Sequence, residues 1–185
     1  MHTNDTHGHA WSHKDRDGVV RGGFAAQNQV VDDVWREVDS AGGFTFVLSA
    51  GDVNTGVPES DLLDGEPDIM AMNRIGYDAM VLGNHEFDKG VEKITKQQGW
   101  AKFPLHQRQR ADQRRELPHP SLCDCRSWCK SRILGLTTGS EGFGHPELIK
   151  DLVVEDPITA AETHPSDEGG RRADHRRPHA HWPYR

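Results

Sequence analysis

The sequence is poor in apolar residues, and the shortage is uneven. Only 34% of its 185 residues are hydrophobic and the mean hydropathy is −0.77, which is low for a globular domain. Regular apolar patterns occur in residues 19–103, whereas residues 104–132 and 164–185 have few apolar residues and many Arg, His, Gln and Pro. The length suffices for one domain with a core, and we expect these two poor segments to pack badly against it.

Further absences exclude whole classes of protein. No apolar run approaches the ~20 residues of a membrane-spanning helix. No signal peptide follows Met1, whose next residues are the polar HTNDTHGH, so the chain as written is expected in the cytoplasm. Three cysteines, Cys123, Cys125 and Cys129, form no disulfide framework because their number is odd. A formal charge of −7 argues against nucleic-acid binding.

Helices and strands are predicted to alternate along the apolar part of the chain. The pattern predicts helices within residues 22–43, 65–76 and 91–103, bounded by glycines or begun near Pro67. The first has an apolar face at helical spacing, made of Val30, Val31, Val34, Trp35 and Val38. Buried strands are predicted at Phe44–Leu48 and within residues 77–86. This alternation indicates an α/β fold.

Three polar clusters fall where strands of such a sheet would end. They are NDTH (4–7), GDVN (51–54) and GNHEFD (83–88), and the strand before the first would have to precede Met1. In open α/β sheets the ligand site lies beyond the carboxyl ends of the strands. Each cluster alone has a structural alternative, since D-x-H is common and GDVN alone is a turn. Together, and in this order, they predict one site.

The residue types in these clusters suit divalent metal ions. Asp5 and His7 are two apart, so on an extended segment both side chains point the same way. Asp52 could bridge two ions with its two oxygens, and Asn84 could offer its amide oxygen. Mixed oxygen and imidazole ligands favour zinc, manganese or iron over calcium. Two ions ~3.5–4 Å apart stabilise the attacking and leaving oxygens of a displacement at phosphorus.

The remaining polar residues of GNHEFD are predicted to serve the substrate. His85 is expected to be free of metal and to hydrogen-bond a phosphoryl oxygen or the leaving group, with Asp88 fixing its tautomer. We assign His85 and Asp88 to catalysis, and Asn84 and His85 to substrate binding. Glu86 has no clear role and is expected to be a solvated or structural group.

The clusters resemble the signature of calcineurin-like dinuclear metallophosphoesterases. The sequence is most similar to the bacterial 5′-nucleotidase/UDP-sugar hydrolase group of that family, on the segments HTNDTHGH, GGFAAQ, SAGDVNTGVPESDLLDGEPD, MNRIGYDAMVLGNHEFD, WAKFP and ILGLTTGSEG. The resemblance implies part of a four-layer α/β/β/α domain with two divalent ions held by Asp5, His7, Asp52 and Asn84. It also implies a small-molecule substrate, either a nucleoside 5′-phosphate or a UDP-sugar, and periplasmic export. We expect a monomer.

The sequence departs from that family in its second half. The later T-H-x-G-H metal motif is missing as written, and so is the C-terminal nucleoside-binding domain. A shift of one nucleotide would allow HAHWPY near the end to encode T-H-I-G-H. We therefore hypothesise that about residues 104–132 and 164–185 are out of frame and irregular, so that residues 1–163 form a partial catalytic domain.

Two alternatives to a 5′-nucleotidase stay open. One is a 2′,3′-cyclic nucleotide phosphodiesterase of the same superfamily, because the same metal clusters serve both. The other is an inactive fragment, since four ligands are few for two ions. A zinc knot formed by the three cysteines and His119 is disfavoured by its spacing.

Overall fold

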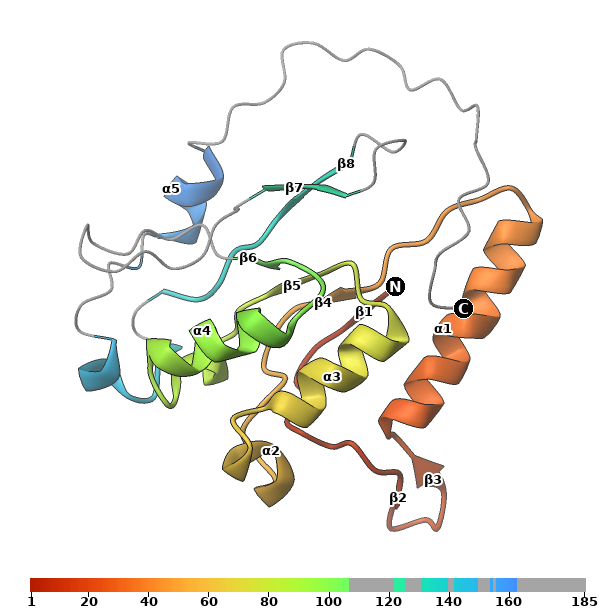
Figure 1. The fold of residues 1–185 in the computed structure, drawn as a ribbon, viewed down its shortest axis with the longest axis horizontal. Coiled ribbons are helices and arrows are strands. Elements are labelled where there is room, and N and C mark those ends of the chain that lie inside the picture. The colour runs from red at the N-terminus through yellow and green to blue at the C-terminus, as the bar shows by residue number, and fades with distance from the viewer. Residues whose placement is uncertain (107–121, 126–130, 140–141, 150–153, 155, 163–185) are drawn as a thin grey trace.

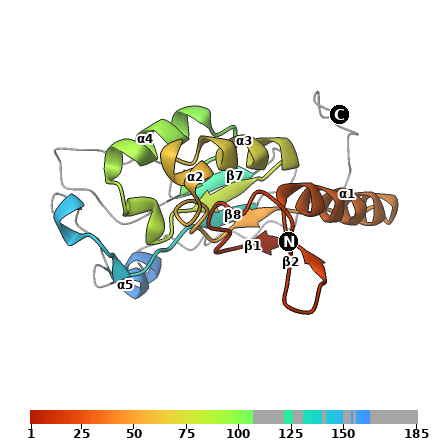
Figure 2. The same ribbon diagram turned by 90° about the horizontal axis from the view of Figure 1, so that it is seen from below.

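The computed structural model describes residues 1–106, 122–125, 131–139, 142–149, 154 and 156–162. Within these residues the largest sheet has four strands in the order β1-β4-β5-β6, and every neighbouring pair is parallel. The strands are β1 (His2–Thr3), β4 (Leu48–Ser49), β5 (Ala79–Val81) and β6 (Leu105–His106). Helices connect them, and Figure 2 shows α3 and α4 on one side of β1 and β4. The predicted α/β class is confirmed (Figure 1).

The three predicted helices are present. They are α1 (Phe24–Ser40), α3 (Glu66–Ile75) and α4 (Val91–Trp100). Gly76 ends α3 in a left-handed conformation with φ 87°, which a glycine adopts without steric cost. The predicted apolar face of α1 is only partly correct, because Val31 is buried whereas Val30 is 59% exposed. A short helix, α2 (Pro58–Leu62), was not predicted from the sequence, although Pro58 at its first turn is a typical start.

Two strand predictions are corrected by the structure. The strand expected at Phe44–Leu48 is β4, Leu48–Ser49, which begins only at the last of those residues. Phe44 and Phe46 lie edge to face instead, with ring centroids 4.8 Å apart. The strand expected to precede Met1 is β1 itself, His2–Thr3, which pairs with β4. Met1 extends this pairing by accepting a hydrogen bond from Leu48 N at 3.0 Å.

The first segment predicted to be irregular, residues 104–132, contains strands. Its residues 105–106 form β6 at the edge of the main sheet, and Leu105 is only 3% exposed. Within it, β7 (Leu122–Cys125) pairs antiparallel with β8 (Ser131–Leu134). The hydrogen bonds between strands use backbone groups and tolerate polar side chains. A segment poor in apolar residues can therefore form strands, and composition alone did not predict these. Residues 107–121, 126–130 and 163–185, including the predicted tail, lie outside the described residues.

The remaining elements are small. They are the hairpin β2 (His13–Lys14) and β3 (Val20–Arg21), the 3₁₀ helices η1 (His85–Phe87) and η3 (Pro146–Leu148), and α5 (Pro157–Glu162). The core joins the sheet to α3 and α4 through residues that are at most 3% exposed, including Ile69, Met72, Met80, Leu82, Phe87 and Ile94. Phe143 joins this core edge to face against Phe87, with ring centroids 4.8 Å apart. None of the helices in the described ranges is long and apolar enough to cross a bilayer.

Candidate metal centre

The site forms where the loops after β1, β4 and β5 meet. The loop after β1 runs beside the loop after β4, with hydrogen bonds from Asp5 N to Gly51 O (3.1 Å), from His7 N to Asp52 O (3.1 Å) and from Gly8 N to Val53 O (2.8 Å). These bonds continue the parallel pairing of the strands beyond their ends. They bring the first two predicted clusters together, as expected for the carboxyl edge of the sheet.

The backbone at this edge is not extended. Asp5, His7 and Asp52 have φ values of 53°, 46° and 52°, in the left-handed region that side chains other than glycine adopt at a cost. The expectation that Asp5 and His7 share one side of an extended segment is therefore wrong in its geometry. Their side chains nevertheless meet, because His7 Nε2 lies 3.8 Å from Asp5 Oδ1. Non-glycine residues in such conformations cluster at functional sites.

Two glycines allow the second and third loops to touch. A Cβ built on Gly51 would lie 2.8 Å from Gly83 Cα and 2.9 Å from Val81 O. A Cβ on Gly83 would lie 2.7 Å from Asp52 N and 2.8 Å from Asp52 Cγ. Both positions therefore leave no room for a side chain. The contact explains why a glycine precedes both Asp52 and Asn84.

Three side chains converge in the space between these loops. His7, Asp52 and His85 each offer one ligand atom, and these atoms all lie within 4.8 Å of one another. The two imidazole rings stand edge to face with centroids 4.9 Å apart. Two imidazoles and a carboxylate suit zinc, manganese or iron. The residues present thus fit a divalent metal ion.

Hydrogen bonds fix which nitrogen each histidine presents. His7 Nδ1 lies 2.7 Å from the carbonyl oxygen of Thr55, which can only accept, so Nδ1 carries the proton and Nε2 has a free lone pair. His85 Nδ1 lies 2.7 Å from Asp88 Oδ2, so in the same way its Nε2 is left for a ligand or substrate. Partners of this kind orient metal-binding histidines in many sites.

Asp88 also changes the acidity of His85. Its hydrogen bond to the ring, together with its negative charge, raises the pKa of His85 above 6.5, because a nearby carboxylate favours the imidazolium form. Thr55 Oγ1 donates to the same Asp88 oxygen at 3.3 Å. The expected contact between His85 and Asp88 is present, while their catalytic role stays a prediction.

Glu86 is structural and is not solvated. It is 0% exposed, and its carboxylate accepts hydrogen bonds from the backbone N–H groups of Asp52 (2.9 Å), Val53 (2.9 Å) and Gly83 (2.7 Å). Burial raises the pKa of Glu86, and the three donors oppose that rise. Of the two possibilities predicted for this residue, the structural one holds.

The other predicted site residues are placed as follows. Asp5 is not one of the three converging side chains, and it contacts them at His7. Asn84 stands at the start of η1, and its carbonyl accepts from Phe87 N at 3.2 Å; its role as a metal ligand stays a prediction. His85, which was expected to be free of metal, is a member of the converging group.

Sequence reasoning missed a second layer of polar residues behind the loops. Asn54 is 1% exposed and donates from its amide to the His85 carbonyl at 3.3 Å. Gln97 of α4 donates both to Asn54 Oδ1 (2.6 Å) and to the Asp64 carbonyl (2.8 Å). Gln97 gave no signal in the sequence, because a Gln in a predicted helix is ordinary.

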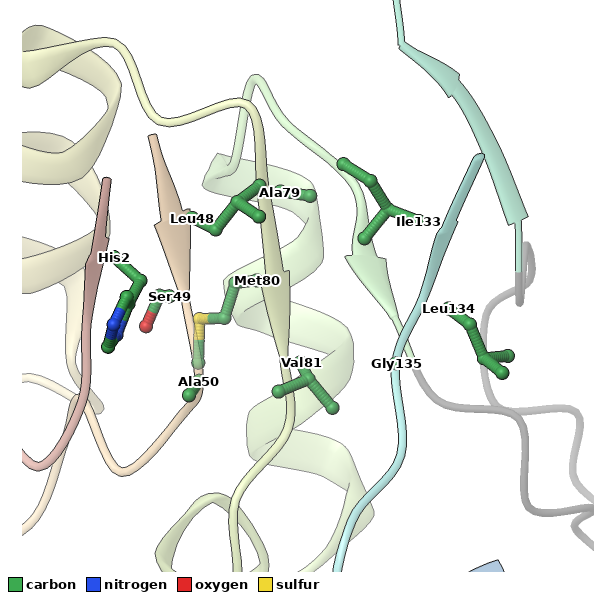
Figure 3. Close-up of a pocket in the computed structure, with 10 residues that line it drawn as sticks. All are labelled: His2, Leu48, Ser49, Ala50, Ala79, Met80, Val81, Ile133, Leu134 and Gly135. Atoms are coloured by element: carbon green, nitrogen blue, oxygen red, sulfur yellow. The ribbon is translucent and has the colours of Figure 1, made fainter. Parts of the chain in front are cut away.

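A cavity of about 210 Å³ lies elsewhere, between the sheet and β8 (Figure 3). Its walls include Met80 from β5 and Ile133 from β8, and none of the predicted site residues lines it. The cavity is therefore separate from the candidate metal centre.

The chain is similar in sequence to several known proteins. The family model described as calcineurin-like phosphoesterase matches residues 1–181. Protein UshA of Yersinia enterocolitica is 43% identical over 166 residues, and a 5′-nucleotidase of Vibrio parahaemolyticus is 42% identical over 165 residues. Each match covers 88% of this chain and 29% of the relative, so the chain spans less than a third of the length of these relatives.

A solved structure has a similar fold. The 5′-nucleotidase precursor from Thermus thermophilus superposes with a TM-score of 0.69 at 28% identity. The match covers 86% of this chain and 32% of that one.

Proposed function

The chain belongs to the calcineurin-like phosphoesterase family, and from this premise we propose that it is a metal-dependent phosphoester hydrolase of nucleotide type. The proposed substrates are nucleoside 5′-phosphates and UDP-sugars. The first class is supported by the similarity to a 5′-nucleotidase of Vibrio parahaemolyticus. The observation that carries the proposal is the convergence of His7, Asp52 and His85 at the carboxyl edge of the sheet. We also propose the periplasm as its location and a monomer as its state.

The proposed metal ligands are Asp5, His7, Asp52 and Asn84, for two divalent ions such as zinc or manganese. Bound divalent ions would supply positive charge that favours attack at phosphorus and departure of the leaving group. His7 supports this role because its free Nε2 is held in place by the hydrogen bond from Nδ1 to the Thr55 carbonyl. Asp52 supports it because His85 N anchors its Oδ1 at 2.9 Å.

His85 is proposed to act on the substrate itself. Its Nδ1 is engaged by Asp88, so Nε2 can hydrogen-bond a phosphoryl oxygen or give a proton to the leaving group. The raised pKa of His85, caused mainly by the Asp88 hydrogen bond, favours the protonated form that such a donor needs. His85 is half-buried, which leaves it open to a substrate.

We expect the 185-residue chain to hydrolyse its substrates slowly. Four proposed ligands are few for two ions, which by ordinary coordination counts need roughly seven or eight groups between them. A low rate is therefore part of the proposal.

The test is hydrolysis of AMP, UDP-glucose and 2′,3′-cyclic AMP, each with and without added Mn²⁺, with the nucleoside and nucleotide products separated by chromatography. We expect slow, metal-dependent turnover of AMP that disappears in His85→Ala. The matched control is His13→Ala, an exposed histidine on β2, which should keep the wild-type rate. Faster turnover of the cyclic substrate than of AMP would show that the chain is a cyclic nucleotide phosphodiesterase instead. The proposal is overturned if His85→Ala leaves AMP turnover unchanged. It is also overturned if neither AMP turnover nor AMP binding depends on added metal.

A further inference from the structure

We propose that Glu86 is the positioning residue of the metal centre, whose carboxylate ties the loop after β4 to the loop after β5. Without it the chain would keep its fold but hold a divalent ion at least tenfold more weakly, which is about the lower limit for losing a partner of a metal ligand. The inference rests on the proposed function, because it assumes that this site binds a metal ion.

The two oxygens of Glu86 divide their partners between the loops. Oε2 accepts from Asp52 N at 2.9 Å and from Gly83 N at 2.7 Å, so a single oxygen bridges both loops. Oε1 accepts from Val53 N at 2.9 Å. The side chain is 0% exposed, so water does not compete for these donors. Charge-assisted hydrogen bonds in a buried setting are stronger than neutral ones.

This arrangement acts on Asp52 from one end while His85 acts from the other. Glu86 holds the backbone N–H of Asp52, and His85 N donates to Asp52 Oδ1 at 2.9 Å. The φ of Asp52 is 52°, a conformation that its own side chain disfavours and that the surroundings must therefore maintain. The carboxylate of Glu86 is the group placed to maintain it.

Neither an amide nor a shorter acid can replace this carboxylate. Glutamine has one acceptor oxygen, so its NH₂ group must face either Val53 N–H or the pair of N–H groups from Asp52 and Gly83. Aspartate lacks one methylene group, so from the same backbone position its oxygens would lie farther from the three N–H groups. Glu86 of GNHE therefore binds the neighbouring loop, whose Asp52 and Val53 lie 34 and 33 residues earlier in the chain.

A simpler alternative is that Glu86 only stabilises the core. A purely structural role predicts that its loss lowers global stability and exposes amides throughout the sheet. A positioning role predicts a local effect on three amides and on the metal. The two roles are therefore separated by amide-resolved hydrogen exchange in the metal-free chain together with titration of Mn²⁺.

The experiment compares wild type with Glu86→Gln and with Asp68→Asn. Asp68 is a similarly buried carboxylate, 1% exposed on α3, so it controls for the change of a buried carboxylate to an amide away from the three amides. We expect Glu86→Gln to speed exchange at the amides of Asp52, Val53 and Gly83 selectively. We also expect its Mn²⁺ dissociation constant to rise at least about tenfold, as for other partners of metal ligands. Asp68→Asn should bind Mn²⁺ like wild type.

The outcomes are distinguishable. A folded Glu86→Gln that binds Mn²⁺ like wild type overturns the inference. A Glu86→Gln that does not fold also overturns it and supports the purely structural role, and so does unprotected exchange of the three amides in the wild type. A wild type that does not bind Mn²⁺ counts against the proposed function, whereas the exchange at these three amides still tests the tie between the loops.

Discussion

Replacing Gly83 by alanine tests the close contact on which the metal centre depends. The added Cβ would lie 2.7 Å from Asp52 N and 2.8 Å from Asp52 Cγ. Non-bonded heavy atoms are most stable at about 3.5–4.0 Å, so one loop must retreat by about 0.7 Å or more. The group displaced is Asp52, whose carboxylate lies within 4.8 Å of the ligand atoms of two histidines. The substitution therefore moves a proposed metal ligand without removing it.

The expected size of the effect follows from that displacement. Disturbing the partners that orient a metal ligand costs about 10–100-fold in affinity, which corresponds to about 1.4–2.8 kcal/mol. Gly99→Ala is the matched control, since a Cβ there meets no atom within 4 Å. Because Gly99 lies inside α4, alanine should stabilise the fold there by about 0.5–1 kcal/mol and leave the metal untouched.

The assay is calorimetric titration of each variant with Mn²⁺, at a temperature where far-ultraviolet circular dichroism shows both to be folded. We expect the dissociation constant of Gly83→Ala to exceed that of Gly99→Ala by at least about tenfold. Equal dissociation constants in two folded variants would refute the account of the loop contact.

Two further predictions concern titrating groups. Asp88→Asn should lower the pKa of His85 toward 6.5, because the carboxylate hydrogen bond is the main cause of its rise; a titration of the His85 ring by NMR checks this, and an unchanged pKa contradicts it. Burial raises the pKa of Asp68 above 3.8, so the folded chain binds this proton more tightly than the unfolded chain does, and stability falls as pH rises through the folded pKa. Asp68→Asn should therefore raise the urea midpoint at about pH 8 and lose that advantage below about pH 4; a variant less stable at the higher pH would show that the charged carboxylate is favourably paired.

The helices were predictable because their signals are local. Gly23 and Gly42 flank α1, and Pro67 and Gly76 mark the ends of α3. The strands were placed less well, because strand ends depend on partners elsewhere in the chain. β4 begins at Leu48, where pairing with β1 and β5 begins, although the apolar run begins earlier.

The candidate site was predictable in its location and less so in its geometry. Polar clusters after strands placed His7, Asp52 and His85 at one edge, and the structure brings them together. The role of Glu86 could not be predicted, because its partners include the backbone N–H groups of Asp52 and Val53, which side-chain patterns do not record. A solvated acid and a buried acid are written with the same letter, and only the fold distinguishes them.

The central claim is that His7 and Asp52 hold a divalent ion beside His85, and paramagnetic broadening by Mn²⁺ tests it most directly. In a titration of the ¹⁵N-labelled chain, we predict that the backbone signals of these three residues disappear first, at less than one ion per chain. The acidic turn at Asp15–Asp17 in the β2–β3 hairpin, in which Asp17 is exposed, serves as the internal comparison. Broadening that begins at this turn while the signals of His7, Asp52 and His85 persist would contradict the account.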